Sequence, residues 1–78
     1  MSAHIVRTAG VCGGSARISR TRIPVWPLEQ FRRLGASEAK LLEAYPSLRA
    51  IDLAEAWRYA DSHPVEMERE IRVNEIDQ

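Results

Sequence analysis

The stretch ISRTRIPVW, residues 18–26, marks the place where the chain changes from an extended to a helical pattern. It contains two arginines, a proline and a tryptophan, and it contains no acidic residue. A proline is tolerated in the first turn of a helix, because the N–H that it lacks would have no helical partner there. Pro24 and Pro27 therefore predict a helix that begins at about residue 25.

Four helices are predicted after this stretch, at about residues 25–34, 38–45 and 50–62, with the fourth in the C-terminal helix and tail at 63–78. Gly35 follows the first helix, where a left-handed helix end favours glycine. Ser37 is a good N-cap for the second helix, and Pro46 ends it. Pro64 suits the first turn of the fourth helix.

Apolar residues at helical spacing predict which sides of these helices face inward. The first helix carries a stripe at threefold spacing, formed by Val25, Leu28, Phe31 and Leu34. On the fourth helix, Met67 and Ile71 lie one turn apart. The side chains that we expect to form the core are Trp57, Phe31, Leu28, Leu42 and Leu53.

Residues 4–18, HIVRTAGVCGGSARI, read as two short extended segments around a turn. Ile5 and Val6 favour one strand, Gly13 and Gly14 allow a hairpin, and residues 16–18 are the return strand. So short a hairpin is marginal alone, so it must pack on the helices or pair with a second chain. We predict a homodimer joined mainly through residues 3–23, which would bury Ile5, Val6, Val11 and Ile18. The alternative is a monomer whose N-terminal arm folds back on its own helices.

The fold class expected is mainly α, with a short N-terminal β segment before a helix-turn-helix bundle of about four helices. At 78 residues the chain is one domain, with a β arm at 1–23, a three-helix core at 24–62 and a C-terminal helix and tail at 63–78. The link PSLR between the second and third helices is compatible with a helix-turn-helix. It is equally compatible with another small helical bundle.

Composition argues against several classes of function. Cys12 is the only cysteine, so an intramolecular disulfide is impossible, and no Cys/His set has zinc-ligand spacing. The chain contains no apolar run long enough for a membrane span, and its first residues are not those of a secretory signal. It also lacks a nucleophile elbow, a phosphate loop and a metalloprotease motif. We therefore expect a cytoplasmic protein that is not an enzyme and that uses no cofactor or metal.

Charge is unevenly distributed along the chain. Residues 1–28 carry four arginines and no acid, giving +4, and residues 29–78 carry seven basic and eleven acidic residues, giving −4. One interpretation is that the basic end contacts a polyanion. The other is that the arginines only keep a short sheet soluble.

The runs CGGSARISRTRIPVW, LGASEAKLLEAYPSL and AEAWRYADSHP resemble a large family of short bacterial proteins, domain of unknown function 433. The matching positions are Gly13, Gly14, Ile18, Thr21, Arg22, Ile23, Pro24, Val25, Gly35, Ser37, Tyr45, Pro46, His63 and Pro64. The sequence departs from the family pattern at residues 15 and 16, at Arg20 in place of glycine, and at Arg49 in place of a capping threonine. Arginine cannot accept a hydrogen bond from the helix amides, so the third helix should lose about 1 kcal/mol at its start.

The resemblance implies a homeodomain-like, three-helix DNA-binding fold. It also implies an antitoxin, whose gene is paired with that of a PIN-type ribonuclease toxin, and which binds the toxin and represses its own operon. Two alternatives are a DNA-binding regulator without a toxin partner and a pure protein-interaction module.

Two sets of residues are candidates for these contacts. The predicted DNA-binding residues are Arg17, Arg20, Arg22, Arg49 and Arg58. Asp52 and Glu55 are expected on the exposed side of the third helix, where they would repel phosphates, so the arginines near residue 20 are the better contact. For the toxin, Arg20 or Arg22 could pair in bidentate geometry with the carboxylates of a metal site.

Overall fold

The computed structural model describes residues 5–8, 10 and 14–76. Near the N-terminus, β1 (Ile5–Val6) pairs with β2 (Arg17–Ile18) in an antiparallel sheet, with Ile5 opposite Ile18. The two predicted extended segments are therefore confirmed. Of the predicted turn, Gly13 lies outside the described residues, and Gly14 has a φ of +86°, a conformation that favours glycine.

β2 is hydrogen-bonded on both of its edges. The backbone N–H of Ile18 donates to the carbonyl of Ile23 at 3.0 Å, and that of Val25 donates to the carbonyl of Ala16 at 2.9 Å. The chain thus turns through residues 19–22 and runs back along β2 before the first helix begins. β2 is consequently the middle of three extended segments, and it offers no free edge to a second chain.

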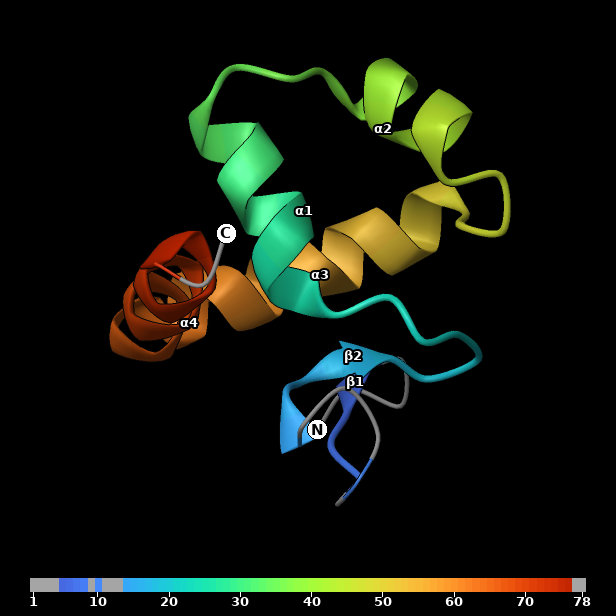
Figure 1. Cartoon of the computed structure of the whole chain (residues 1–78). Coiled ribbons are helices and arrows are strands. Elements are labelled where there is room, and N and C mark those ends of the chain that lie inside the picture. The colour runs from blue at the N-terminus through green and yellow to red at the C-terminus, as the bar shows by residue number, and fades with distance from the viewer. Residues whose placement is uncertain (1–4, 9, 11–13, 77–78) are drawn as a thin grey trace.

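Four helices follow in the described part of the chain: α1 (Val25–Arg33), α2 (Glu38–Ala44), α3 (Ala50–Ser62) and α4 (Pro64–Ile76). α3 is central, because it contacts the other three helices and β1. Figure 1 shows α1 crossing α3, with α2 near one end of α3 and α4 near the other. The predicted mainly α fold, with a short β segment before about four helices, is confirmed.

The helix ends agree closely with the predicted ones. α1 and α2 each end one residue before the predicted position, and α3 has its predicted bounds. Gly35 follows α1 with a φ of +93°. The hydroxyl of Ser37 accepts from the backbone N–H of Lys40 at 3.1 Å, which confirms the predicted N-cap.

α3 begins with Arg49 at the N-cap position, and its guanidinium has no acceptor to offer. The carboxylate of Asp52 compensates for this, because its Oδ2 accepts from the backbone N–H of Arg49 at 2.8 Å. This contact is the reciprocal half of a capping box, and it places a negative charge in the first turn of the helix. The start of α3 is therefore stabilised by the third residue of the helix rather than by its cap.

The core contains side chains from all four helices and from the N-terminal segment. Its buried members are Ala16, Ile18, Val25, Leu28, Leu41, Leu48, Leu53, Ala56, Ala60 and Met67. Met67 and Ile71 are both buried, as predicted. Because Ala16 and Ile18 are 1% and 0% exposed, the N-terminal segment is part of the core. Burial of a side chain such as Ile18 contributes about 1.5–3 kcal/mol.

The predicted apolar stripe of α1 is only half correct. Val25 and Leu28 are buried, but Phe31 is 41% exposed and Leu34 is 76% exposed. Residues three apart on an α-helix are offset by about 60° from a common line, so a threefold stripe rotates out of the core within three steps. Phe31 is therefore not a core residue, whereas Glu29 of the same helix is buried.

The other predicted core residues divide in the same way. Leu28 and Leu53 are fully buried, whereas Leu42 and Trp57 are partly buried and pack against the core. The indole of Trp57 donates to Glu38 at 3.2 Å, and the guanidinium of Arg32 lies 4.6 Å from its ring centre. Trp57 thus packs against the core at its margin, where one side of the indole is exposed to polar neighbours.

None of the helices in the described residues is long and apolar enough to cross a membrane.

Candidate nucleic-acid interface

The loop at residues 19–22 is held in shape by Arg17. Its guanidinium donates to the carbonyls of Ser19 and Thr21, at 3.0 and 3.1 Å, and to the hydroxyl of Thr8 at 3.0 Å. The side chain of Thr21 adds two local bonds, to the carbonyl of Ile18 and from the N–H of Ile23. Arg17 is half-buried and both of its Nη atoms are used in these contacts, so we assign it a structural role.

Arg20 contacts an acid of its own chain. Its Nη2 lies 2.6 Å from Oδ2 of Asp52, which is 0% exposed. Burial raises the pKa of Asp52, but the hydrogen bonds from the backbone of Arg49 and from Arg20 outweigh it, so the pKa is lowered from its ordinary value. Asp52 is therefore a buried carboxylate at the start of α3, and Arg20 connects it to the loop.

These contacts correct two expectations. Arg20, predicted to contact DNA or a toxin carboxylate, pairs with Asp52 of its own chain. Asp52 is not on the exposed side of α3, so it does not face an approaching phosphate. Arg20, which stands where the family pattern has glycine, supplies a partner for the acid.

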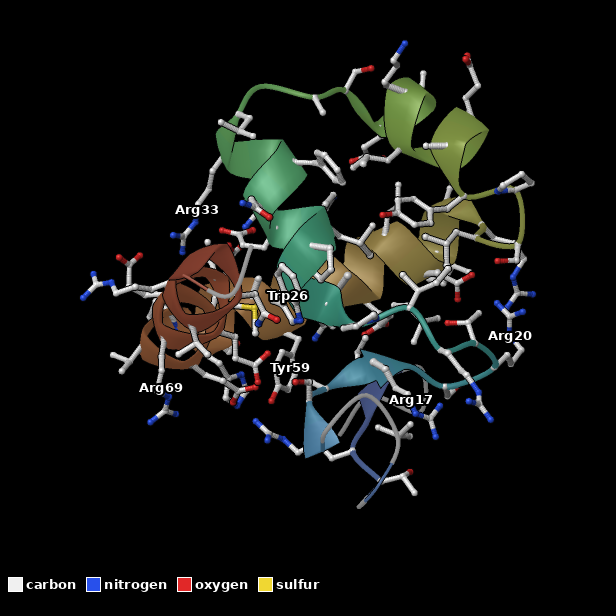
Figure 2. The ribbon with its side chains drawn as sticks, in the orientation of Figure 1. Arg17, Arg20, Trp26, Arg33, Tyr59 and Arg69 are labelled. Atoms are coloured by element: carbon white, nitrogen blue, oxygen red, sulfur yellow. The ribbon has the colours of Figure 1, made fainter. Side chains whose placement is uncertain are left out.

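The cations of the loop and of the start of α3 lie close together. Arg17, Arg20 and Arg22 line one shallow depression with Ser19 and Thr21. Arg49 adjoins it, because its Nε is 3.5 Å from the same Asp52 oxygen that Arg20 contacts. We call Arg17, Arg20, Arg22 and Arg49 the basic surface (Figure 2, where Arg17 and Arg20 are labelled).

The outer side of α3 extends from this surface. Its exposed residues include Ile51, Ala54 and Arg58, each about one turn from the next. Glu55 is half-buried beside them, and Tyr59 is half-buried and bonded elsewhere. Four of the five predicted DNA-binding arginines are therefore together, and Arg58 lies two turns further along α3.

A second polar cluster, which the sequence analysis did not predict, lies at the C-terminal end of α3. The phenol of Tyr59 accepts from Arg7 at 2.8 Å and bonds to both carboxylate oxygens of Glu66, and Arg7 also pairs with Glu66. Burial is the main cause that raises the pKa of Tyr59. The imidazole of His63 stacks on the Tyr59 ring at 4.0 Å. Because Arg7 follows β1, this cluster attaches the first strand to α3 and α4.

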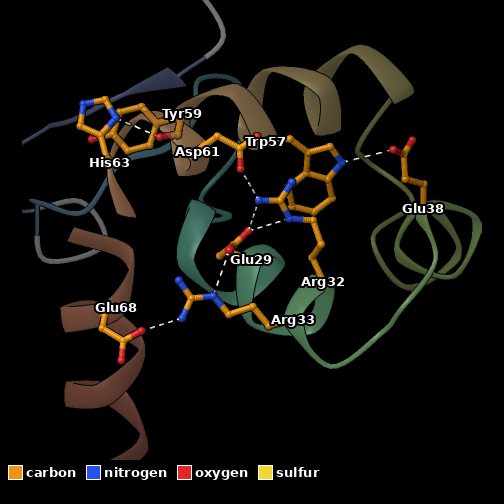
Figure 3. A network of polar contacts seen from close by, with 9 residues as sticks. All are labelled: Glu29, Arg32, Arg33, Glu38, Trp57, Tyr59, Asp61, His63 and Glu68. Carbon is orange, nitrogen blue, oxygen red and sulfur yellow. Dashed lines mark hydrogen bonds and ion pairs between the residues drawn. The ribbon is translucent and has the colours of Figure 1, made fainter. Parts of the chain in front are cut away.

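A third group of charges connects α1 to its neighbours (Figure 3). The buried Glu29 accepts from Arg32 and Arg33 on its own helix. Arg32 also forms an ion pair with Asp61 of α3 at 2.7 Å, and Arg33 forms one with Glu68 of α4 at 2.8 Å. All five residues lie within residues 29–78, so the opposite net charges of the two parts of the sequence give no signal for these contacts. Only the helical spacing of Glu29 with Arg32 and Arg33 does so, and it does not reveal Asp61 or Glu68.

Together the fold and these sites define a class of small, mainly α-helical proteins in which a β hairpin packs on a helical core and brings arginines to the start of the third helix. Comparison with known proteins gives the family. The sequence profile of a family described as a protein of unknown function, DUF433, matches residues 5–60. The chain belongs to this family, which confirms the resemblance in its sequence.

A solved structure is similar over most of the chain. It is the crystal structure of a DUF433 member protein from Anabaena variabilis ATCC 29413, with 51% sequence identity and a TM-score of 0.85. The match covers 88% of this chain and 68% of that chain. Among curated proteins, no match was found.

Proposed function

We propose that this protein is the antitoxin of a type II toxin–antitoxin pair. It binds and neutralises a PIN-type ribonuclease in the cytoplasm, represses its own operon by binding DNA, and catalyses no reaction. The toxin partner follows from the family resemblance. The DNA-binding part is supported by one structural observation, the basic surface at the N-terminal end of α3.

The burial of Asp52 strengthens the DNA-binding proposal. An exposed acid at the start of α3 would repel phosphates, but this one is enclosed and paired with Arg20. Arg22, Arg49 and Arg58 are exposed; Arg22 lies in the loop beside Arg20, Arg49 at the start of α3 and Arg58 on α3. In this proposal they contact phosphates or guanine, and Ile51 and Ala54 contact thymine methyl groups.

A homodimer stays part of the proposal, in altered form. Ile18 is buried in its own chain and β2 has no free edge, so the predicted burial of Ile18 between two chains is wrong. Val11 of the predicted contact lies outside the described residues. A twofold contact would therefore use β1, whose Ile5 and Val6 are half-buried.

DNA binding is tested by fluorescence anisotropy with labelled duplex from the region upstream of the gene. We expect the logarithm of the binding constant to fall linearly with the logarithm of the salt concentration, and the slope to drop by about 1 in Arg49→Ala and in Arg58→Ala. Lys40→Ala, on α2, is the matched control and should leave the slope unchanged. Absence of salt-dependent binding would contradict the proposal.

The toxin part is tested separately, by co-expression with a PIN-like protein encoded next to this gene. We expect the two chains to co-purify and the ribonuclease activity to fall as the antitoxin is added. DNA binding without any such complex would favour the alternative, a transcriptional regulator without a toxin.

A further inference from the structure

The side of the molecule away from the basic surface carries exposed apolar residues that the fold does not use. Leu34, at the end of α1, is 76% exposed, and on α4 Val65 is 76% and Val73 is 50% exposed. α4 is thus apolar on two sides, because Met67 and Ile71 of the same helix face the core. An apolar side that the chain itself does not cover indicates a contact with another molecule.

These residues line two adjoining depressions. One lies along α4 between Val65 and Val73, and the other lies between α4 and the end of α1 at Leu34. The two share Glu68 and Arg72, so they form one continuous feature, which we call the α4 groove. Val65 and Val73 are eight residues apart, which corresponds to about 12 Å along the helix, or roughly two turns.

The charge of the groove is positive. Arg33, Arg69 and Arg72 border it, and Glu68 is its one acid among the lining residues. The carboxylate of Glu68 is used by two arginines, with Arg33 and Arg72 each at 2.8 Å, and these contacts lower its pKa. Arg69 has no ion-pair partner among the described residues, and Figure 2 shows it directed away from the body of the molecule.

We infer that the α4 groove is the docking surface for an acidic amphipathic helix of a partner protein. Apolar anchors spaced two turns apart along one helix, here Val65 and Val73, fit the apolar side of another helix. Carboxylates along the flank of that helix would pair with Arg69 and Arg72. The inference rests on the proposed function, in which the partner is the toxin, and it assigns the toxin contact to this groove instead of to Arg20 or Arg22.

The same charges disfavour two other occupants. A second copy that used this groove on both chains would bring two arginine-rich surfaces face to face across a twofold axis. A nucleic acid would leave Leu34, Val65 and Val73 against phosphates, which gain nothing from apolar contact. The groove and Arg20 lie on opposite sides of the view in Figure 2, where Arg33 and Arg69 mark the groove, so partner and DNA could be held together.

The test uses a labelled synthetic helix of about 18 residues, with leucines at i, i+3, i+4 and i+7 and glutamates on both flanks, titrated with the full chain. We expect binding that weakens about tenfold in Val73→Asp and in Arg69→Glu, and that changes less than about twofold in the charge-matched control Lys40→Glu. A second peptide with glutamine at every glutamate should bind about tenfold more weakly. Circular dichroism of each variant checks that it is folded.

Three results would overturn the inference. They are no binding of the acidic peptide, equal binding of the two peptides, and a homodimer that Val73→Asp dissolves, which would make a second copy the occupant. Each variant is also titrated with the upstream duplex. If the parent chain binds that DNA but does not bind the acidic peptide, the groove assignment is wrong and the DNA-binding function stands.

Discussion

The two ends of α3 both attach the N-terminal β segment to the helices, but they do so with different degrees of burial. At the N-terminal end the acid is Asp52, which is 0% exposed and holds Arg20. At the C-terminal end the pair is Arg7 and Glu66, whose side chains are 50% and 13% exposed. We therefore expect burial, and not the number of ion pairs, to decide how much each attachment contributes to the stability of the fold. A buried carboxylate that loses its partner is costly, whereas an arginine in water is not.

Removing Arg20 should have the largest effect. In Arg20→Ala the buried Asp52 keeps only its contacts at Arg49, so we expect the free energy of unfolding to fall by about 3 kcal/mol. Urea denaturation followed by circular dichroism measures this loss. Arg58→Ala removes an exposed arginine of α3 and should change stability by less than about 0.5 kcal/mol. Equal effects of the two variants would show that Asp52 does not depend on Arg20.

Acid should act next, and through the same carboxylate. Because the pKa of Asp52 is lower in the folded chain than in the unfolded one, its ionisation stabilises the fold above the unfolded value of about 4. This stability is lost as the pH falls through the lower, folded pKa. In thermal melts between neutral and strongly acidic pH, the melting temperature should therefore fall more steeply with pH in the parent than in Asp52→Asn. The lowered pKa of Glu68 acts in the same direction in both proteins, so the difference isolates Asp52. Parallel curves would contradict the assignment.

Arg7→Ala should have a smaller effect, since half of the Arg7 side chain is in water. We expect a loss of about 0.5–1 kcal/mol, measured in the same urea experiment as Arg20→Ala. A double-mutant cycle with Glu66→Ala would show whether the loss belongs to this pair. If Arg7→Ala destabilises the chain as much as Arg20→Ala, the two ends of α3 are equivalent and the comparison is wrong.

Salt should give the smallest change, and it should act mainly on the exposed contact. At about 1 M salt the Debye length is near 3 Å, so the exposed Arg7 contact is screened and the buried Asp52 contact is screened much less. We expect the difference in the free energy of unfolding between Arg7→Ala and the parent to shrink by a few tenths of a kcal/mol. The corresponding difference between Arg20→Ala and the parent should persist. Denaturation series at low and high salt measure both differences. An effect of salt on Arg20→Ala alone would contradict the expected order.

Much of the fold was predictable from the sequence because its signals are local. Proline, glycine and serine set helix ends through their own backbone and side-chain chemistry, and Ser37 and Gly35 do so here. The failures concern directions around a helix. Phe31 lies on a threefold pattern that rotates out of the core, and the side of α1 that is covered is decided by how α3 and α4 pack against it.

The candidate site was predicted only as a set of residue types. The arginines near residue 20 were identified, and four of the predicted DNA-binding residues do lie together. Their partners were not identified, because Asp52 meets Arg20 from 32 positions away and Arg7 meets Tyr59 from 52 positions away. Excess charge of opposite sign in two halves of a chain indicates that such pairs can form, but only the three-dimensional packing selects them.

The backbone bonds that hold residues 23–25 against β2 also bear on the order in which the chain folds. The segment from Ala16 to Val25 closes a loop of roughly ten residues, an event that takes about 10–100 ns in an unfolded chain. Closing this loop brings Ile18 and Val25 together at the start of α1. The contacts involved join residues close in sequence, which favours fast formation. The attachment of β1 to the helices through Arg7 forms later, since it needs both α3 and α4 in place. In pulse-labelling hydrogen exchange, the amides of Ile18 and Val25 should therefore be protected before those of residues 5 and 6.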